Sequence, residues 1–352
     1  MDPRTSLGRS CGIDRHRAGC ARQPADDVDE PIGYKPIACV DASELSSQMP
    51  GWNVEFTQLS PGALAANGGT VALNGVLVGQ LTLDQSLLRR GHAPRGSAAV
   101  LIPGSASSQA FVLGRRLEPA QCIAMAEGAS IEVITRRDYV DVALAVDLHA
   151  WRGQSQWLSE CALATSRGSW VARPGPLWIN RMRHTVRWLF KAIQEYPQAL
   201  GRPDVRASLA DQFVMAIGEF GSESAEAEHP TRDARVQQRI AVERAREYIR
   251  AKLAEPLRLS ELCRYAHVQA RSLEYGFREI TGLSPIAYVK SLRLNAVRRD
   301  LSRTDAADHS ISEIALDHGF WHLSQFAADY RKFFGETPTS TRHRARALHA
   351  VG

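Results

Sequence analysis

The sequence predicts a two-domain α+β protein, with a β-rich N-terminal domain that includes a helical hairpin and an all-α C-terminal domain. Three observations predict this fold class. Short runs of Val, Ile, Leu and Thr recur between Gly, Pro and Asn over residues 36–151, the apolar spacing becomes helical from about residue 177, and a polar, acidic segment then precedes a second helical region. At 352 residues the chain also exceeds the size at which one hydrophobic core keeps growing.

The composition, with 44% hydrophobic and 23% charged residues, is that of a globular protein. No stretch approaches the roughly 20 apolar residues that span a bilayer, and the N-terminus lacks the apolar core of a secretory signal, so we expect a cytoplasmic protein without a membrane partner. The cysteines form no C-x-x-C pair and no metal-ligand spacing, which predicts free structural thiols and no metal site. They are Cys11, Cys20, Cys39, Cys122, Cys161 and Cys263.

Residues 1–35 predict a disordered leader, because Arg, Asp, Gly and Pro are mixed there with few apolar residues. Residues 36–220 form the expected β-rich sensor or dimerisation domain. Its strand-like runs are 52–59, 70–83, 98–102, 110–113, 120–126, 131–135 and 141–148. Their spacing predicts an antiparallel β-sandwich or barrel.

Apolar residues at helical spacing predict a helical hairpin over residues 177–220. They recur from Ile179 to Ile193, the chain breaks at Pro197, and the spacing resumes from Val205. The hairpin either packs against its own sheet or forms the interface of a homodimer, and the sequence leaves both interpretations open.

Residues 221–235 are polar and acidic and contain Pro230, which predicts a linker. Residues 236–345 are helical in pattern and carry the positive charge of the chain. From Val236 to the end there are 19 Lys and Arg against 13 Asp and Glu, whereas the first 235 residues hold 24 against 25. A basic region of this kind is where a polyanion would bind.

An internal repeat organises the C-terminal domain. The segment 277–285 (FREITGLSP) returns 53 residues later as 330–338 (YRKFFGETP), and 259–262 (LSEL) returns as 311–314 (ISEI). Each copy is typical of a short helix, a tight turn and a second helix that ends at a Gly and is followed by a capping Ser/Thr-Pro. This is the pattern of a helix-turn-helix unit, whose second helix can enter the major groove of DNA.

The two predicted groove helices cover about 270–281 and 322–334, and a rigid helix over 284–301 joins them. Ser310 and Glu313 predict a capping box before the second unit. Two such helices on one polypeptide can read successive major-groove faces on the order of 34 Å apart. The sequence therefore predicts a protein that binds double-stranded DNA.

Over about residues 241–342 the sequence resembles the AraC-type (AraC/XylS) transcription regulators. The residues that carry the resemblance are the 277–285 element, Arg293-Leu294, Ser312-Glu313-Ile314-Ala315, Gly319-Phe320 and Phe334-Gly335-x-x-Pro338. The resemblance implies a transcription activator whose N-terminal cupin-like barrel binds a small-molecule effector and which contacts RNA polymerase. Segments 293–299 (RLNAVRR) and 319–330 (GFWHLSQFAADY) resemble more narrowly the ethanolamine-operon regulator subgroup.

Carried over by position, the resemblance places DNA-reading side chains at the start of each groove helix. They are Arg271, Ser272, Glu274 and Tyr275 in the first helix, and His322, Leu323, Ser324 and Gln325 in the second. Arg271 suits guanine or phosphate, Glu274 suits cytosine, and Tyr275 suits phosphate or a thymine methyl group. In the second helix Ala328 stands where the family often has an arginine, which predicts a weaker reader.

Phosphate contacts are expected from Arg293, Arg298, Arg299 and Arg342, the alternative for each being a solvated basic face. Leu273 and Phe277 should face the core, and so should Trp321 at the second turn.

A metalloenzyme built on a cupin-type barrel is one alternative. His92 and His149 are the histidines of the sheet region, and no H-x-H with a following carboxylate is present to hold a metal. Catalytic nucleophile, phosphate-loop and dinucleotide signatures are also missing. We therefore expect neither an enzyme nor a cofactor. The stronger alternative is a DNA-binding protein whose N-terminal domain only dimerises, and the sequence does not name an effector.

Overall fold

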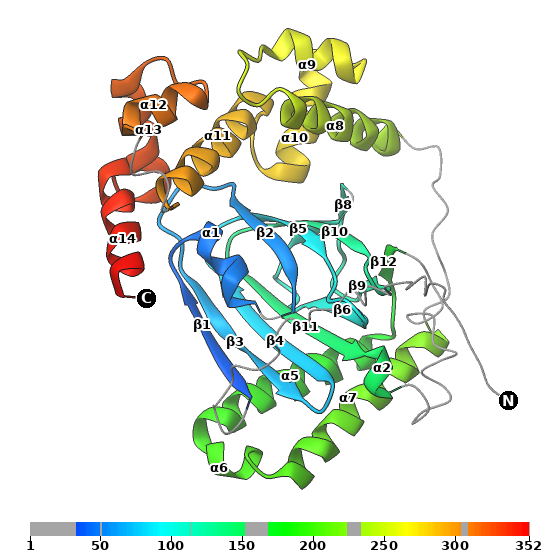
Figure 1. Cartoon of the computed structure of the whole chain (residues 1–352). Helices are drawn as coiled ribbons and strands as arrows, with labels where there is room; N and C mark the ends of the chain where they lie inside the picture. The colour runs from blue at the N-terminus through cyan, green and yellow to red at the C-terminus, as the bar shows by residue number, and fades with distance from the viewer. Residues whose placement is uncertain are drawn as a thin grey trace, which may run out of the picture.

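The computed structural model describes residues 33–49, 51–112, 114–151, 168–223, 234–303 and 309–351. Helices of a hairpin lie under a β-rich N-terminal domain, and an all-helical C-terminal domain lies on the other side of the sheets (Figure 1). This is the two-domain α+β arrangement that the sequence predicts. The expected leader and linker fall largely outside the described residues.

The N-terminal domain contains two antiparallel sheets, a seven-stranded one in the order β1-β3-β4-β11-β6-β9-β12 and a five-stranded one in the order β2-β5-β10-β7-β8. The strands are β1 (Tyr34–Cys39), β2 (Asn53–Gln58), β3 (Ala66–Leu73), β4 (Val76–Leu83), β5 (Leu87–His92), β6 (Ser97–Pro103), β7 (Ala110–Val112), β8 (Arg115–Arg116), β9 (Cys122–Met125), β10 (Ser130–Thr135), β11 (Tyr139–Asp147) and β12 (Ser169–Ala172). Buried side chains of both sheets, among them Val54, Leu81, Leu101 and Val133, form one shared core. This two-layered arrangement is the expected β-sandwich or barrel.

Two features of the sheets differ from the predicted strands. The run 70–83 is a hairpin instead of one strand, because Asn74 (φ 40°) and Gly75 (φ 81°) form a left-handed two-residue loop between β3 and β4. Strands β1, β5, β8 and β12 were not predicted. β12 has four residues and pairs with β9, more than 40 residues earlier, so local spacing does not reveal it.

Short helices α1 (Ala42–Leu45) and α2 (Leu148–Trp151) and the 3-10 turn η1 (Ser46–Gln48) flank the strands. The hairpin consists of α5 (Pro176–Glu195), α6 (Pro197–Leu200) and α7 (Pro203–Glu223). Trp178 and Phe213 of the hairpin share a core with Val78 and Leu144 of the seven-stranded sheet, and the Trp178 Nε1–H donates to the Ala216 carbonyl at 2.7 Å. The hairpin therefore packs against its own sheet.

The C-terminal domain consists of seven helices among the described residues. They are α8 (Ala234–Ala251), α9 (Leu259–Ala266), α10 (Ala270–Thr281), α11 (Pro285–Leu301), α12 (Ile311–Asp317), α13 (Leu323–Phe334) and α14 (Pro338–Val351). Ser284 caps α11, and Ser310 and Glu313 form the predicted capping box of α12. Gly282 and Gly335 end α10 and α13 in the left-handed conformation that glycine favours.

The C-terminal domain covers the outer face of the five-stranded sheet. Leu59, Leu88, Phe111 and Ile134 from the sheet side belong to the same hydrophobic core as the buried faces of α8, α10 and α11. A smaller core joins α11 to α12 and α13. The two domains thus share apolar contacts.

The described cysteines Cys39, Cys122 and Cys263 are free thiols. Burial raises the pKa of the Cys39 thiol to about 11 and also raises that of Cys122. Within the described ranges, no three His, Cys, Asp or Glu residues are grouped to hold a metal ion. None of the helices placed by the structure combines the length and the apolar character needed to cross a bilayer.

Candidate nucleic-acid interface

The first helix-turn-helix unit consists of α9, a turn at His267 and α10. His267 takes the left-handed conformation (φ 57°) that reverses the chain between the helices. Leu273 and Phe277 are buried, as predicted, and fix one face of α10 against α8 and α9. Gly276 allows the close approach, because a Cβ there would lie 2.7 Å from Val242 Cγ2.

The start of α10 is turned to solvent. Arg271 and Ser272 are exposed, Tyr275 is 64% exposed, and Glu274 is half-buried. The four residues predicted to read DNA in this unit therefore lie together on the first turns of one helix, and three of them are exposed.

The second unit consists of α12, a turn at Gly319 (φ 77°) and α13. The predicted side chains His322, Leu323, Ser324 and Gln325 are all exposed at the start of α13. Trp321 was expected in the core, but it is 63% exposed. That prediction was wrong, because Phe320 and Phe326 pack at this core instead, with ring centroids 5.0 Å apart and ring planes at 49°.

Arg293 binds the protein's own backbone at the junction of the two units. Its Nε donates to the Leu253 carbonyl at 2.8 Å, its Nη1 to the Gly319 carbonyl at 3.3 Å, and its Nη2 to the Glu255 carbonyl. Burial lowers the pKa of this guanidinium. Arg293 therefore connects the loop between α8 and α9 to the turn of the second unit, which differs from the phosphate contact expected of it.

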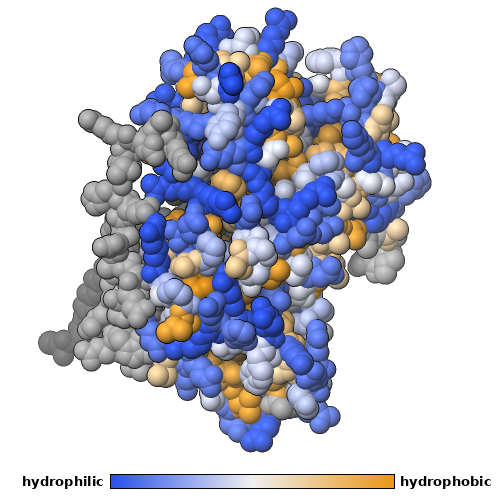
Figure 2. Space-filling view, turned by 180° about the vertical axis from the view of Figure 1, so that it is seen from behind, coloured by the Kyte–Doolittle hydropathy of each residue, from blue (hydrophilic) through white to orange (hydrophobic). Residues whose placement is uncertain are grey.

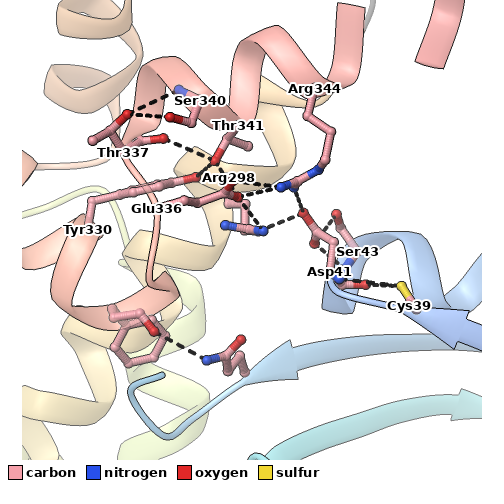
Figure 3. Close-up of polar contacts among 12 residues, drawn as sticks. Cys39, Asp41, Ser43, Arg298, Tyr330, Glu336, Thr337, Ser340, Thr341 and Arg344 are labelled. Atoms are coloured by element: carbon pink, nitrogen blue, oxygen red, sulfur yellow. Dashed lines mark hydrogen bonds and ion pairs between the residues drawn. The ribbon is translucent and has the colours of Figure 1, made fainter. Parts of the chain in front are cut away.

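Arg298 is buried between the domains. Its Nε lies 2.6 Å from Asp41 Oδ2, before α1, and its Nη2 lies 2.8 Å from Glu336 Oε1, after α13. Arg344 of α14 pairs with the same two carboxylates at 3.1 and 2.7 Å (Figure 3). Burial opposes the charge of Arg298, but Asp41 and Glu336 outweigh burial and raise its pKa.

The phosphate contact expected of Arg298 is wrong for this structure, because the residue is 4% exposed and its guanidinium pairs with two carboxylates. Of the other two candidates, Arg299 is exposed and lies 3.7 Å from Glu55. Arg342 is half-buried, and two of its guanidinium nitrogens have no hydrogen-bond partner among the described residues.

The N-terminal domain contacts the last turn of both groove helices. At α10, the Arg136 guanidinium donates to backbone carbonyls that include Glu279. At α13, the Gly62 N–H and the Gln58 side-chain amide donate to the Phe333 carbonyl at 2.8 and 3.3 Å. The last carbonyls of a helix lack partners within the helix, so these donors attach both helices to the sheet domain.

Further polar contacts hold α8 and α11 on the five-stranded sheet. Glu132 of β10 lies 2.5 Å from Arg246 Nη1 and 3.5 Å from Arg250 Nη1. Asn295 of α11 exchanges two hydrogen bonds with the Gln58 backbone, at 2.8 and 2.9 Å. These contacts hold the two units on the sheet domain. The first turns of α10 and α13 stay exposed.

Comparison with known proteins gives matches to regulators. A helix-turn-helix domain family matches residues 262–344. The probable thc operon regulatory protein of Rhodococcus erythropolis is 36% identical over 101 residues, 29% of each chain. XylDLEGF operon transcriptional activator 2 of Pseudomonas putida is 38% identical over 99 residues, 28% of this chain and 63% of that protein. The crystal structure of a probable AraC family transcriptional regulator from Rhodopseudomonas palustris CGA009 is 35% identical and covers 30% of this chain and 96% of that one, with a TM-score of 0.28.

Two helix-turn-helix units joined by α11 define a double helix-turn-helix protein. Over its C-terminal third the chain is similar to AraC-type transcription regulators. The aligned region spans less than two thirds of either curated relative. The narrower resemblance to the ethanolamine-operon regulators stays a prediction.

Proposed function

We propose that this protein is a sequence-specific DNA-binding transcription regulator that inserts α10 and α13 into successive stretches of the major groove. The observation that carries the proposal is the exposed, polar start of both helices at equivalent places of the repeat. The relatives are named as transcription regulators, which favours DNA binding over catalysis.

The chemistry of the exposed side chains assigns their roles. Arg271 reads guanine or a phosphate, and Glu274 accepts from the amino group of cytosine. Gln325 is the polar reader of α13, where Trp321 adds an apolar surface for a thymine methyl group or sugar. Arg299 and Arg342 serve the phosphates, together with the N–H groups at the starts of α11 and α14.

Control of DNA binding follows from the contacts between the domains. Because Arg136, Gln58 and Gly62 hold the last turns of α10 and α13, a shift in the sheet domain changes how the two helices are presented. An effector then acts by favouring one arrangement over the other. As an activator, the DNA-bound protein would contact RNA polymerase, a partner that the family suggests.

A second candidate is that the N-terminal domain dimerises without binding an effector. Large apolar side chains of the hairpin stay exposed, with Leu177 at 87%, Trp188 at 56%, Tyr196 at 65% and Met215 at 59%. Figure 2 shows hydrophobic surface at the lower end of the molecule, where Figure 1 places α5–α7. An exposed apolar patch of this kind fits a second copy of the chain. Sedimentation velocity of Trp188→Glu against wild type tests it, and an unchanged oligomeric state contradicts it.

The main proposal is tested by measuring how the full chain binds a selected promoter library. Fluorescence anisotropy reports the binding at each step of a salt titration. The affinity should be specific and should fall steeply with salt. Arg271→Ala should lose about 1 to 3 kcal/mol of discrimination at one base position. Arg187→Ala, an exposed arginine on α5, is the matched control and should leave binding unchanged. Equal binding of every sequence would overturn the proposal.

A further inference from the structure

A cavity of about 390 Å³ lies where the five-stranded sheet meets the start of α8 and the end of α10. Its walls come from both domains, with residues of β7 and β8 on one side and residues of α8 and α10 on the other. Figure 1 shows β8 below α8 and α10. Its size lies within the range of small-molecule sites. By contrast, one cavity inside the sheet domain, beside Ile37, Met49 and Leu81, has about 10 Å³ and holds at most a water molecule.

The walls of the larger cavity are unusually basic. Arg115, Arg116 and Arg173 line it from the N-terminal domain and Arg239 lines it from α8, whereas Glu118 and Glu279 are its acidic residues, so positive charge is in excess. Each guanidinium has five N–H donors, so an arginine that already contacts a neighbouring group keeps others for a ligand. A planar guanidinium matches carboxylate, sulfonate and phosphate oxygens, and a partly enclosed site strengthens the attraction.

The cavity also offers apolar walls. Phe111, Val171 and Ile280 line it beside the arginines. The Arg239 stem passes close to the β7–β8 turn, because a Cβ on Gly114 (φ 72°) would lie 3.3 Å from Arg239 Cγ. The cavity is therefore built by close contact between the two domains and combines cationic groups with apolar surface.

The position of the cavity connects it to the first groove helix. Glu279 and Ile280, in the last turn of α10, are part of its wall. The Glu279 carbonyl is also the acceptor of the Arg136 hydrogen bond that attaches α10 to the sheet domain. A molecule bound here would touch both domains and the helix that reads DNA.

We propose that this cavity binds a small organic anion, an apolar body with a carboxylate, sulfonate or phosphate group, as the effector of the regulator. The anionic group pairs with Arg116, Arg173 and Arg239, and the apolar body packs on Phe111 and Ile280. The effector role rests on the proposed function, whereas binding of the anion does not require DNA.

A pair of fluorescent probes tests the site on the full chain. 8-Anilinonaphthalene-1-sulfonate carries an anion on an apolar body, and N-phenyl-1-naphthylamine is the same body without the anion. The sulfonate probe should saturate the site, and the neutral probe should bind at least about tenfold more weakly, because it lacks the charge-assisted hydrogen bonds. Equal affinity of the two probes would overturn the proposal.

Two double variants locate the binding. Arg116→Gln with Arg173→Gln removes two exposed charges of the cavity and should weaken sulfonate binding about tenfold. Arg95→Gln with Arg187→Gln removes the same charge from exposed positions elsewhere and should bind as wild type does. If the cavity variant binds as tightly as wild type, the anion site lies elsewhere and the proposal fails.

Promoter binding with and without saturating sulfonate probe tests the effector role separately. A severalfold change in DNA affinity, lost in the cavity variant, supports it. An unchanged DNA affinity with the probe bound overturns the effector role alone. Probe binding by a chain that shows no sequence-specific DNA binding would instead overturn the proposed function.

Discussion

At the scale of single residues, burial separates the arginines that hold the two domains together from those that lie at the surface. Arg246 is 1% exposed and Arg298 is 4% exposed, and each pairs with one carboxylate from the other domain, Glu132 and Asp41 respectively. Arg271, at the start of α10, is exposed at the surface. A buried charge needs a counter-charge, because an unpaired ion in the interior is strongly destabilising.

Replacing Asp41 with Asn should lower the free energy of unfolding by about 3 kcal/mol, because Arg298 and Arg344 lose a shared buried counter-charge. Urea denaturation measures the change. Asp204→Asn breaks an exposed pair with Arg202 and is the control, for which little change is expected. An equal loss of unfolding free energy in both variants would show that the buried ion pairs stabilise the protein no more than an exposed pair does.

The sequence predicts whether a residue lies on the buried or the exposed face of a helix better than it predicts which distant segment packs against that face. Leu273 and Phe277 were correctly placed in the core by their spacing alone. Arg298 was not, because Asp41 covers it from 257 residues away. Trp321 was misplaced because two neighbouring phenylalanine rings pack at the core that it was expected to enter.

At the scale of elements, local signals proved the most reliable. The capping box of α12 was predicted because both of its hydrogen bonds lie within four residues. Strand β12 was not predicted because its partner β9 is distant in the chain. The end of α10 and the start of α11 were predicted for the same reason. A left-handed glycine marks the first and a capping serine marks the second, and both signals are local.

Ser310→Ala should destabilise the second unit by about 1 kcal/mol, because the Glu313 N–H loses its acceptor. Thermal unfolding followed by circular dichroism measures the loss. Ser312→Ala, on the exposed side of the same helix, is the control. A Ser312→Ala variant as unstable as Ser310→Ala would argue against the cap.

At the scale of the whole molecule, the two-domain layout was predictable but the contact between the domains was not. Alternation of apolar and polar residues along a strand shows that the strand has two faces, but it does not show what covers each face. Leu88 and Phe111 could have faced solvent, a partner or another domain. Only the structure shows that helices beginning more than 120 residues further along the chain cover them. For this reason the cavity between the domains has no signal in the sequence.

The attachment of the domains should weaken in acid. Burial raises the pKa of the Glu132 carboxyl, but Arg246 and Arg90 lower it by more, so its pKa in the folded protein lies below the ordinary value. A carboxyl of this kind stabilises the fold above its unfolded pKa of about 4.3 and loses that contribution as the pH falls through the folded value.

Glu132→Gln should therefore be less stable than wild type at neutral pH, and the difference should shrink as the pH falls below about 4.3. Free energies of unfolding measured by denaturant across this range check it. Glu247→Gln, on the exposed face of α8, should follow the wild-type curve. A pH-independent difference for Glu132→Gln would contradict the assignment.

The shared core of the two domains has a consequence for synthesis on the ribosome. The sheet carrying Leu88, Phe111 and Ile134 leaves the ribosome long before α8, α10 and α11 exist to cover it. A nascent chain in that state presents an apolar sheet face to the cell, which is the kind of surface that chaperones bind. Premature termination before α11 should therefore yield a product prone to aggregation and degradation, instead of a free-standing sensor domain.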